Sequence, residues 1–448
     1  MKFALIGLLA ACALAPGMAV AAMGPFQVYE QALRRDPAYL GAFKAREAGQ
    51  EYRAIGRAGL LPNLSYHYNK GRNHSEATYL GGSRRESDDR RYDSYGSSFM
   101  LQQPLFDYEA YAAYRKGVAQ ALFADESFRE QSQQLLVRVL ASYTQALFAQ
   151  DQIAISVASK QAYRQQFEQN ARLFQAGEGT RTDILEAQAR FELADAEEIQ
   201  ARNDQDAALR ELGALIGEPA MPAQALAPLR TGFVLPVVAP SGYEAWQSLA
   251  LASNPQLGAQ RHALEVARFE VERNRAGHLP KVTAYATSRR QQSDSGNTYN
   301  QRYDTNTVGI EVSLPLFAGG GVSASTRQAS RHLEQAEYEL DGTTRSTLIE
   351  LRKQYNACQT GASRLRAYER ALHAAEALVV STRKSVLGGE RVNLDVLNAE
   401  QQLATTRRDL AQARYDYLLA WIKLHQQAGT LGEEQLARVD EAFVSQGR

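Results

Sequence analysis

The chain is poor in cysteine: its 448 residues include only Cys12 and Cys358. Residues 1–22 carry a lysine at position 2, continue with an apolar run and end with small residues, a pattern typical of a secretory signal peptide. A buried N-terminal helix is the alternative, and the Leu-Ala-Ala-Cys sequence that ends at Cys12 also resembles a lipoprotein box. Removal of the signal peptide leaves Cys358 alone, which excludes an intrachain disulfide and predicts an inert packing residue.

The chain also lacks the features of several other protein classes. After residue 22 it has no apolar run of about eighteen residues, so no transmembrane helix is expected and any membrane-spanning part must consist of strands. Its 50 basic and 50 acidic residues balance, which gives no indication of a nucleic-acid partner. Its seven histidines have no metal-ligand spacing, and no nucleophile or nucleotide motif is present. We therefore expect neither an enzyme nor a cofactor or metal site.

What the chain does contain is an internal repeat. A polar residue followed by Pro, a Leu-Pro pair and a Pro-Leu-Phe sequence occur in this order in both halves, at 36–37, 61–62 and 104–106 and again at 254–255, 279–280 and 315–317. Such a repeat constrains the architecture more strongly than any single element. The sequence therefore predicts repeat 1 over 23–217, a proline-rich connector over 218–240, repeat 2 over 241–430 and a C-terminal tail over 431–448.

Each repeat contains two segments in which apolar and polar residues alternate. They lie near 62–104 and 280–315, and a helical pattern over 27–57 precedes the first pair. The polar stretch 71–91 is expected to be an exposed loop. Strands of about ten residues with alternating faces and aromatic ends are typical of a transmembrane barrel, with an ordinary soluble sheet as the alternative. Too few strands are present to close a barrel, so membrane insertion requires oligomerisation.

Each repeat ends in a long helical hairpin, over 107–217 and 322–428. The outgoing helix of the first hairpin is about 100 Å long at the usual rise of 1.5 Å per residue, which is too long for a compact domain. An alanine-rich heptad seam on the returning helix of the second hairpin predicts coiled-coil packing. The turn 177–188 (GEGTRTDILEAQ) aligns without a gap with the turn 389–400 (GERVNLDVLNAE).

The complete pattern resembles the TolC family of outer-membrane export ducts. In each repeat a Leu-Pro pair precedes the first strand, Pro-Leu-Phe follows the second, and a long helix leads to a turn with a conserved spacing of Gly, Asp, Leu and Ala. The resemblance implies a mixed α/β membrane protein. It implies a homotrimer with a twelve-stranded β-barrel in outer-membrane lipid, four strands per chain, continuous with a long periplasmic α-helical coiled-coil barrel. The connector is expected in an equatorial region of that assembly.

The resemblance also implies partners. A periplasmic adaptor, or membrane fusion protein, is expected to join the duct to an inner-membrane pump. The turn 177–188 is most similar to members that serve type I secretion, in which an ABC transporter drives export of an unfolded protein cargo. A duct for a proton-driven efflux pump of small molecules is the first alternative, and a periplasmic coiled-coil scaffold that never enters a membrane is the second.

Roles for residues of the two turns follow from the same resemblance. It implies a periplasmic gate in which Arg391 binds Asp183 and Thr182. It implies a pore constriction at Asp395 and Asn398, where many members carry two acidic rings and this chain keeps one carboxylate. The residues expected at the tip and against the adaptor are Gly177, Glu178, Gly179, Gly389 and Glu390.

Helix capping is the alternative role for Asp183. Thr180 and Asp183 have the spacing of a capping box, and a carboxylate in a first helical turn interacts favourably with the helix dipole. Asp395 is the equivalent of Asp183 in the other turn, and Arg391 is expected near the start of the same helix, where a cation is locally unfavourable. The sequence therefore favours a distant partner for Arg391 more strongly than for Asp183.

Overall fold

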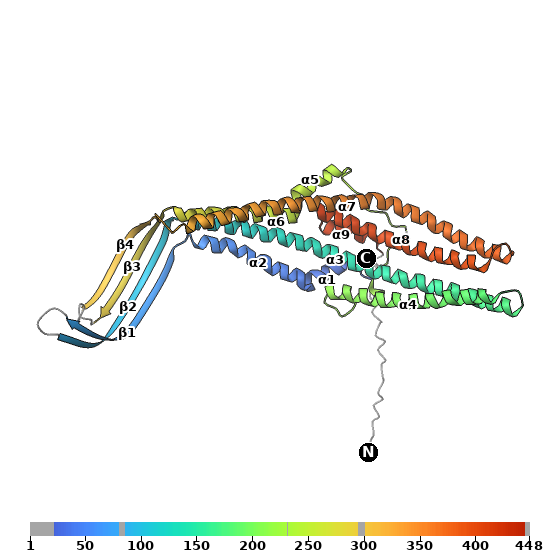
Figure 1. The fold of residues 1–448 in the computed structure, drawn as a ribbon, viewed down its shortest axis with the longest axis horizontal. Coiled ribbons are helices and arrows are strands. Elements are labelled where there is room, and N and C mark those ends of the chain that lie inside the picture. The colour runs from blue at the N-terminus through green and yellow to red at the C-terminus, as the bar shows by residue number, and fades with distance from the viewer. Residues whose placement is uncertain (1–21, 80–85, 231, 294–300, 444–448) are drawn as a thin grey trace, which may run out of the picture.

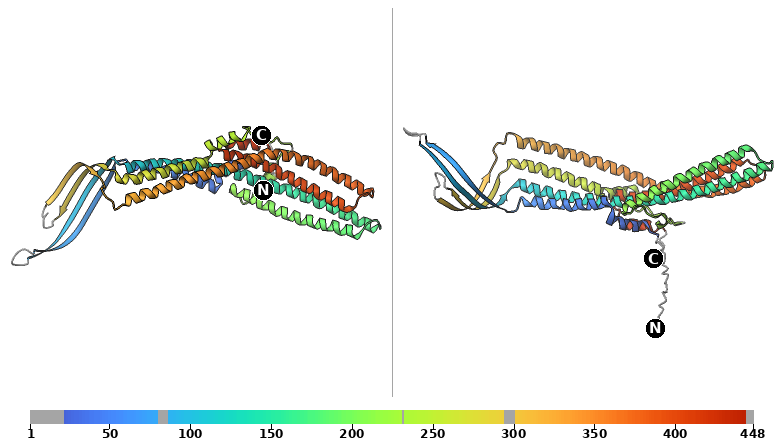
Figure 2. Two further views of the ribbon diagram at one scale, coloured as in Figure 1. Left: turned by 45° about the horizontal axis from the view of Figure 1, so that its top comes forward. Right: turned by 90° about the horizontal axis from the view of Figure 1, so that it is seen from below.

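The computed structural model describes residues 22–79, 86–230, 232–293 and 301–443. The expected signal peptide, with Cys12, lies outside these residues apart from Ala22. The described chain is a long rod with a sheet at one end and two helical hairpins at the other (Figure 1). Two further views show the same extended shape, so the hairpins and the sheet occupy opposite ends (Figure 2).

Helices form most of the rod, and α3 and α7 are its longest elements, with 68 and 67 residues. The absence of proline inside them permits this length, because an interior proline removes a hydrogen bond and clashes with the preceding turn. No helix in the described part of the chain is both long and apolar enough to cross a membrane. The helices are α1 (Pro25–Arg35), α2 (Pro37–Ala58), α3 (Tyr108–Gln175), α4 (Arg181–Leu215), α5 (Tyr243–Ser253), α6 (Pro255–Arg275), α7 (Gly321–Leu387), α8 (Asn393–Ala428) and α9 (Glu433–Asp440), with short 3-10 turns η1 (Ala223–Ala225) and η2 (Ala276–His278).

The polar-Pro pairs divide helices that the sequence pattern joins. The helical pattern over 27–57 is two helices, because Asp36 has an extended backbone that proline imposes on the residue before it. Asp36 then caps α2, its Oδ1 accepting from the Tyr39 amide at 2.7 Å. Asn254 repeats this arrangement at the start of α6 and accepts from the Leu257 amide at 3.0 Å. The expectation of one continuous helix over 27–57 was therefore wrong at Asp36.

The sheet is antiparallel, with strand order β1-β2-β3-β4. Its strands are β1 (Asn63–Tyr79), β2 (Glu86–Phe106), β3 (Lys281–Ser293) and β4 (Gln301–Ser313). The expected loop over 71–91 was wrong, because β1 and β2 continue as a ladder through most of it. Polar side chains support that ladder across the strands: His74 Nε2 lies 2.5 Å from Asp89 Oδ1, and Asn73 Nδ2 donates to Ser94 Oγ at 2.8 Å. The first hairpin is thus longer than the second, with strands of 17 and 21 residues against 13 and 13.

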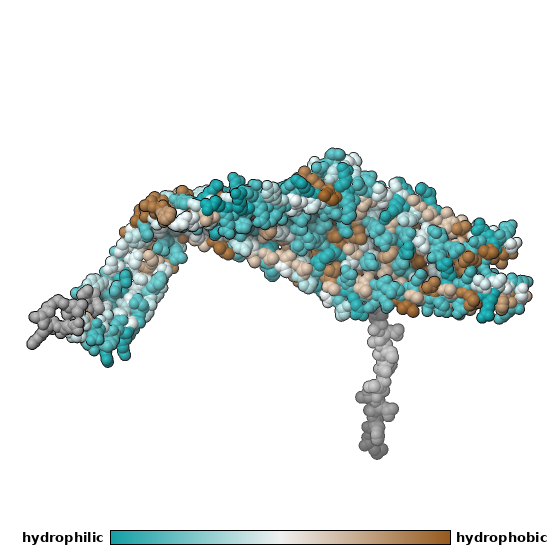
Figure 3. Space-filling view, in the orientation of Figure 1, coloured by the Kyte–Doolittle hydropathy of each residue, from teal (hydrophilic) through white to brown (hydrophobic). Residues whose placement is uncertain are grey.

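Apolar side chains are exposed on the sheet and where it meets the helices. The space-filling view shows them gathered at this junction (Figure 3). Leu316 and Phe317, which follow β4, are 90% and 87% exposed, and Val308 on β4 is 86% exposed. Such a large exposed apolar surface indicates contact with another apolar phase or chain.

The main hydrophobic core lies in the middle of the rod. It joins α1, α3, α4, α5, α7, α8, α9 and the connector, and its largest fully buried side chains include Tyr143, Trp246, Trp421 and Phe443. The region expected as a C-terminal tail contributes α9 to this core, and Asp440 Oδ1 accepts from the Phe26 amide at 3.0 Å. These C-terminal residues are therefore a packed part of the fold.

Candidate functional site

The two hairpin turns at the far end of the rod have the same backbone geometry. Gly177 and Gly389 adopt left-handed conformations, with φ of 80° and 74°. The next amide closes each turn onto the preceding helix: Glu178 N donates to Leu173 O and Glu390 N to Ser385 O, both at 2.9 Å. This is the Schellman motif, which needs glycine because a side chain is strained at positive φ.

The first turn adds a complete capping box at the start of α4. Thr180 Oγ1 accepts from the Asp183 amide at 3.1 Å, and Asp183 Oδ2 accepts from the Thr180 amide at 3.2 Å and from Thr180 Oγ1 at 2.6 Å. Two helix-terminal amides are thereby satisfied, so local capping is one role of Asp183. Thr182, its neighbour, is exposed.

The second turn lacks this cap. Val392 occupies the capping position of α8 and offers no side-chain acceptor. Arg391 Nη1 lies 3.8 Å from Asp395 Oδ2, with the two side chains 54% and 37% exposed. A pair this long and this exposed contributes little stability. Within one chain the structure therefore brings Arg391 to Asp395, and does not pair it with Asp183 or Thr182.

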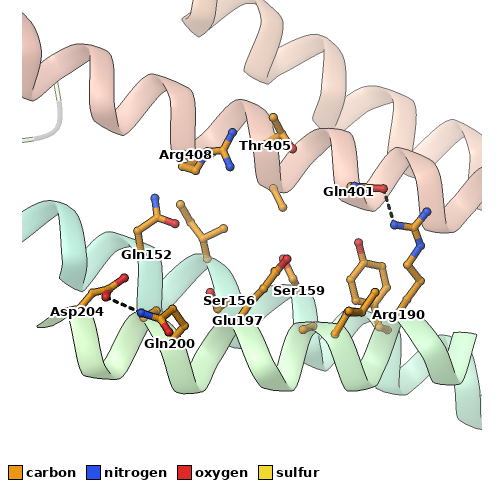
Figure 4. Close-up of a pocket in the computed structure, with 16 residues that line it drawn as sticks. Gln152, Ser156, Ser159, Arg190, Glu197, Gln200, Asp204, Gln401, Thr405 and Arg408 are labelled. Atoms are coloured by element: carbon orange, nitrogen blue, oxygen red, sulfur yellow. Dashed lines mark hydrogen bonds between the residues drawn. The ribbon is translucent and has the colours of Figure 1, made fainter.

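Asn398, expected at the pore constriction, contacts the other hairpin of the same chain. Arg190 on α4 donates through Nη2 to Asn398 Oδ1 at 3.3 Å and through Nη1 to Gln401 Oε1 at 2.6 Å. The close-up shows the bond to Gln401 joining the two hairpins (Figure 4). A glutamate or aspartate at position 398 would form an ion pair with Arg190 in this position.

A buried cluster of amide side chains, not predicted from the sequence, lies beside the tips. Gln166 and Asn170 of α3 hydrogen-bond to each other and to Asn393 in the first turn of α8. Asn170 Nδ2 also donates to Asp183 O at 2.9 Å. Asn170 is only 2% exposed, so its hydrogen bonds are shielded from water. The sequence does contain a signal for this cluster. Gln166 and Asn170 are four residues apart, so they share one face of α3, and Tyr163 on the same buried face lies one turn before Gln166.

Behind the amide cluster, α3, α4 and α8 enclose a polar groove. Its volume is about 410 Å³, and Gln152, Ser156, Ser159, Glu197, Gln200 and Thr405 are among its lining residues (Figure 4). The described residues contain no group of side chains that could hold a metal ion. Cys358 lies near the middle of α7 and packs in the main core, where burial raises the pKa of its thiol to about 12. That this thiol is unreactive stays a prediction.

Comparison with known proteins identifies the architecture. The family model described as outer membrane efflux protein matches residues 28–218 and 246–430. The chain belongs to the outer membrane efflux protein family. Its resemblance to TolC is thereby confirmed, and the chain is an outer-membrane protein.

Individual relatives match over nearly the whole chain. The alkaline protease secretion protein AprF of Pseudomonas aeruginosa is 53% identical over 95% of this chain and 88% of its own length. The proteases secretion protein PrtF of Dickeya chrysanthemi is 43% identical over 96% of this chain and 93% of its own length. Among solved structures, the outer membrane protein VceC of Vibrio cholerae has a TM-score of 0.78 at 19% identity, covering 90% of this chain and 96% of its own. The last comparison shows the shared fold: a four-stranded sheet continuous with long helical hairpins, as in one chain of a barrel-and-tunnel channel.

Proposed function

We propose that the chain, as a homotrimer, forms the outer-membrane duct of a type I secretion machine that exports proteins. The observation that carries the proposal is the 53% identity with AprF over 95% of the chain, because AprF is named for protease secretion. The partners in this proposal are a periplasmic adaptor and an inner-membrane ABC transporter. The chain itself acts as a conduit and not as an enzyme.

The proposed domain division follows the internal repeat. Residues 1–22 are a signal peptide, 23–217 and 241–430 are the two repeats, and 218–240 connect them. The four-stranded sheet supports the formation of an oligomer, because its two edge strands, β1 and β4, need partners within a membrane.

The proposed gate is a link between chains. Asp183 uses only Oδ2 in its capping box, and Oδ1 makes no hydrogen bond to the described part of the same chain. Arg391 is half exposed and only weakly paired with Asp395. The free carboxylate oxygen and the guanidinium are therefore both available to a neighbouring copy, so capping and gating are compatible roles of Asp183. A solvent-exposed link of this kind contributes about 1 kcal/mol, which holds a mouth closed and lets a partner open it.

Conductance in planar bilayers tests the gate. Arg391→Gln and Asp183→Asn should each raise single-channel conductance, since either change removes one side of the link. Arg181→Gln is the matched control, because Arg181 is an exposed cation in the first turn of α4 with no proposed partner. Unchanged conductance in both gate variants would refute the assignment.

Deletion of the gene in its own host tests the cargo class. Loss of extracellular proteins, with unchanged sensitivity to antibiotics and detergents, is the expected result. Increased sensitivity with an intact set of secreted proteins would instead favour the small-molecule efflux duct.

A further inference from the structure

A groove runs along β3 on the face of the sheet that exposes apolar side chains. Between Val282 and Arg290 this face of β3 carries only small residues, Ala284, Ala286 and Ser288, whereas its neighbours carry larger ones. The groove has a volume of about 310 Å³, and its walls include Leu64, Phe99 and Leu101 on one side and Val308 on the other. Because β2 and β4 of the same chain flank β3, pairing of the edge strands with other copies leaves the groove open.

The groove leads to a pair of arginines. Side chains two residues apart on a strand share a face and lie about 7 Å apart, so Arg290 follows Ser288 at the end of the groove. Arg290 is paired in register with Asp304, and Arg302 lies one row further on β4. Asp304 bridges the two guanidinium groups: Oδ1 lies 2.6 Å from Arg290 Nε, and Oδ2 lies 3.4 Å from Arg302 Nε.

The bridged pair carries excess positive charge. Two arginines share one carboxylate, so the group keeps a net positive charge. Arg290 and Arg302 remain more than half exposed, at 56% and 58%. Asp304 contacts both arginines at Nε and so orients the two guanidinium groups. The Nη donors of both groups then remain for another ligand. Fixed guanidinium groups are well suited to a phosphate, which they bind through charge-assisted and bidentate hydrogen bonds.

The arginines lie at the end of the sheet that is remote from the helices. All four strands join the helical part at the opposite end, near Asn63, Phe106, Lys281 and Ser313. In an outer-membrane protein whose helices extend into the periplasm, the remote end faces the outer leaflet. The groove then lies at the depth of acyl chains, and the arginines lie at the depth of headgroups.

We propose that the β3 groove and the Arg290–Asp304–Arg302 group bind a phosphorylated glycolipid of the outer leaflet. One acyl chain lies in the groove, and a phosphomonoester contacts both arginines. A phosphomonoester carries nearly two negative charges at neutral pH and three strong acceptor oxygens, so it interacts with two guanidinium groups more favourably than a phosphodiester with a single charge does.

Native mass spectrometry of the full-length channel, purified from outer membranes in detergent, tests this site with lipid A as the probe. The double variant Arg290→Gln with Arg302→Gln should lower lipid A affinity by about tenfold or more, because two charge-assisted contacts are lost. Ala286→Leu, which fills the groove and keeps the charges, should also weaken binding. Arg289→Gln is the matched control: it removes the same charge from the same strand, on the opposite face.

Further lipids separate phosphate recognition from non-specific adsorption. Dephosphorylated lipid A and phosphatidylglycerol should both bind more weakly than lipid A. Equal binding of either one, or equal lipid A binding by wild type and both site variants, would overturn the proposal. Migration of each variant as an unheated oligomer in gel electrophoresis shows that a loss of binding is not a loss of folding. Protein secretion is not the readout, so the result is independent of the proposed cargo.

Discussion

The middle of the rod and the hairpin tips are built in different ways. The middle buries Tyr143, Trp246, Trp421 and Phe443 in one large core. The apolar contact between the hairpins near the tips is much smaller, and its buried residues are Tyr163, Ala187, Ala194 and Leu397. Each large aromatic side chain buries 150–250 Å², far more than an alanine does. Stability is therefore concentrated in the middle, and hydrogen bonds make up a larger share of the contacts at the tips.

The chain ends reinforce this difference. Tyr143 Oη donates to Met23 O and Ala227 O, both at 2.8 Å, and Met23 N donates to Ala225 O at 2.7 Å. The start of the described chain, the connector and α9 are thus joined in the middle of the rod. Each tip is one short turn that contains glycine, and most of its side chains are exposed. The proposed opening of the channel at its tips agrees with this difference, because a segment that moves must rearrange at a small cost in free energy.

The largest effect is expected from removing a core aromatic. Trp421→Ala should cost about 4 kcal/mol, since the side chain is 1% exposed and its Nε1 donates to Val237 O at 3.1 Å. The melting temperature of the solubilised oligomer should fall markedly. Leu387→Ala at the tip, where the side chain is 77% exposed, is the control and should change stability by no more than about 0.5 kcal/mol. Equal losses from both variants would contradict a core concentrated in the middle.

The middle should also be sensitive to acid through His425. Burial, followed by the charge of Arg438, lowers the pKa of His425 from 6.5 to about 4. The unfolded chain therefore binds a proton at this histidine more readily than the folded chain does. The contribution of neutral His425 to the free energy of unfolding is fully present above pH 6.5 and is lost as the pH falls toward 4, by at most about 3 kcal/mol. His425→Gln should show a smaller loss than wild type over this range in pH-dependent melting. Parallel melting curves would refute the role of His425.

At the tips, the amide cluster should control local opening. Asn170→Ala removes the partner of Gln166, Asn393 and Asp183 O and should cost about 2 kcal/mol. Amide hydrogen exchange should accelerate at both turns and stay unchanged in the middle. Gln200→Ala, which removes an exposed amide from α4, is the control. Unchanged exchange at the turn 389–400 would mean that the cluster does not couple the two tips.

The smallest effects should come from the helix caps that distinguish the two turns. Thr180→Ala should destabilise the first turn of α4 by about 1 kcal/mol, because it removes half of the capping box. Val392→Ser should have the opposite sign and stabilise the first turn of α8 by a few tenths of a kcal/mol, since it supplies the missing acceptor. Site-resolved hydrogen exchange at amides 181–184 and 393–396 measures both. If both variants changed the stability of their helix ends in the same direction, α4 and α8 would not differ in capping as the structure indicates.

Much of the fold could be predicted from the sequence because its signals are local. Glycine at 177 and 389, the long proline-free stretches and the Pro-Leu-Phe sequences determine where α3 and α7 begin and end. Two predictions were wrong because the local composition indicates one backbone conformation and the chain adopts another. The stretch 71–91 is polar enough to indicate a loop, yet its charged side chains pair across β1 and β2. The helix over 27–57 is interrupted because Asp36 both precedes a proline and caps the next helix.

The sequence by itself determined the repeat, the lengths of the helices and the identity of the turn residues, since each depends on neighbours within a few positions. Only the tertiary structure decided the partner of each polar side chain. Arg190 contacts Asn398, Asn170 meets Asn393, and α9 caps α1 across more than 400 residues through Asp440 and Phe26. The physical reason is that a local pattern fixes backbone conformation and burial, whereas hydrogen-bond partners depend on which distant segments the folded chain brings within about 3 Å of each other.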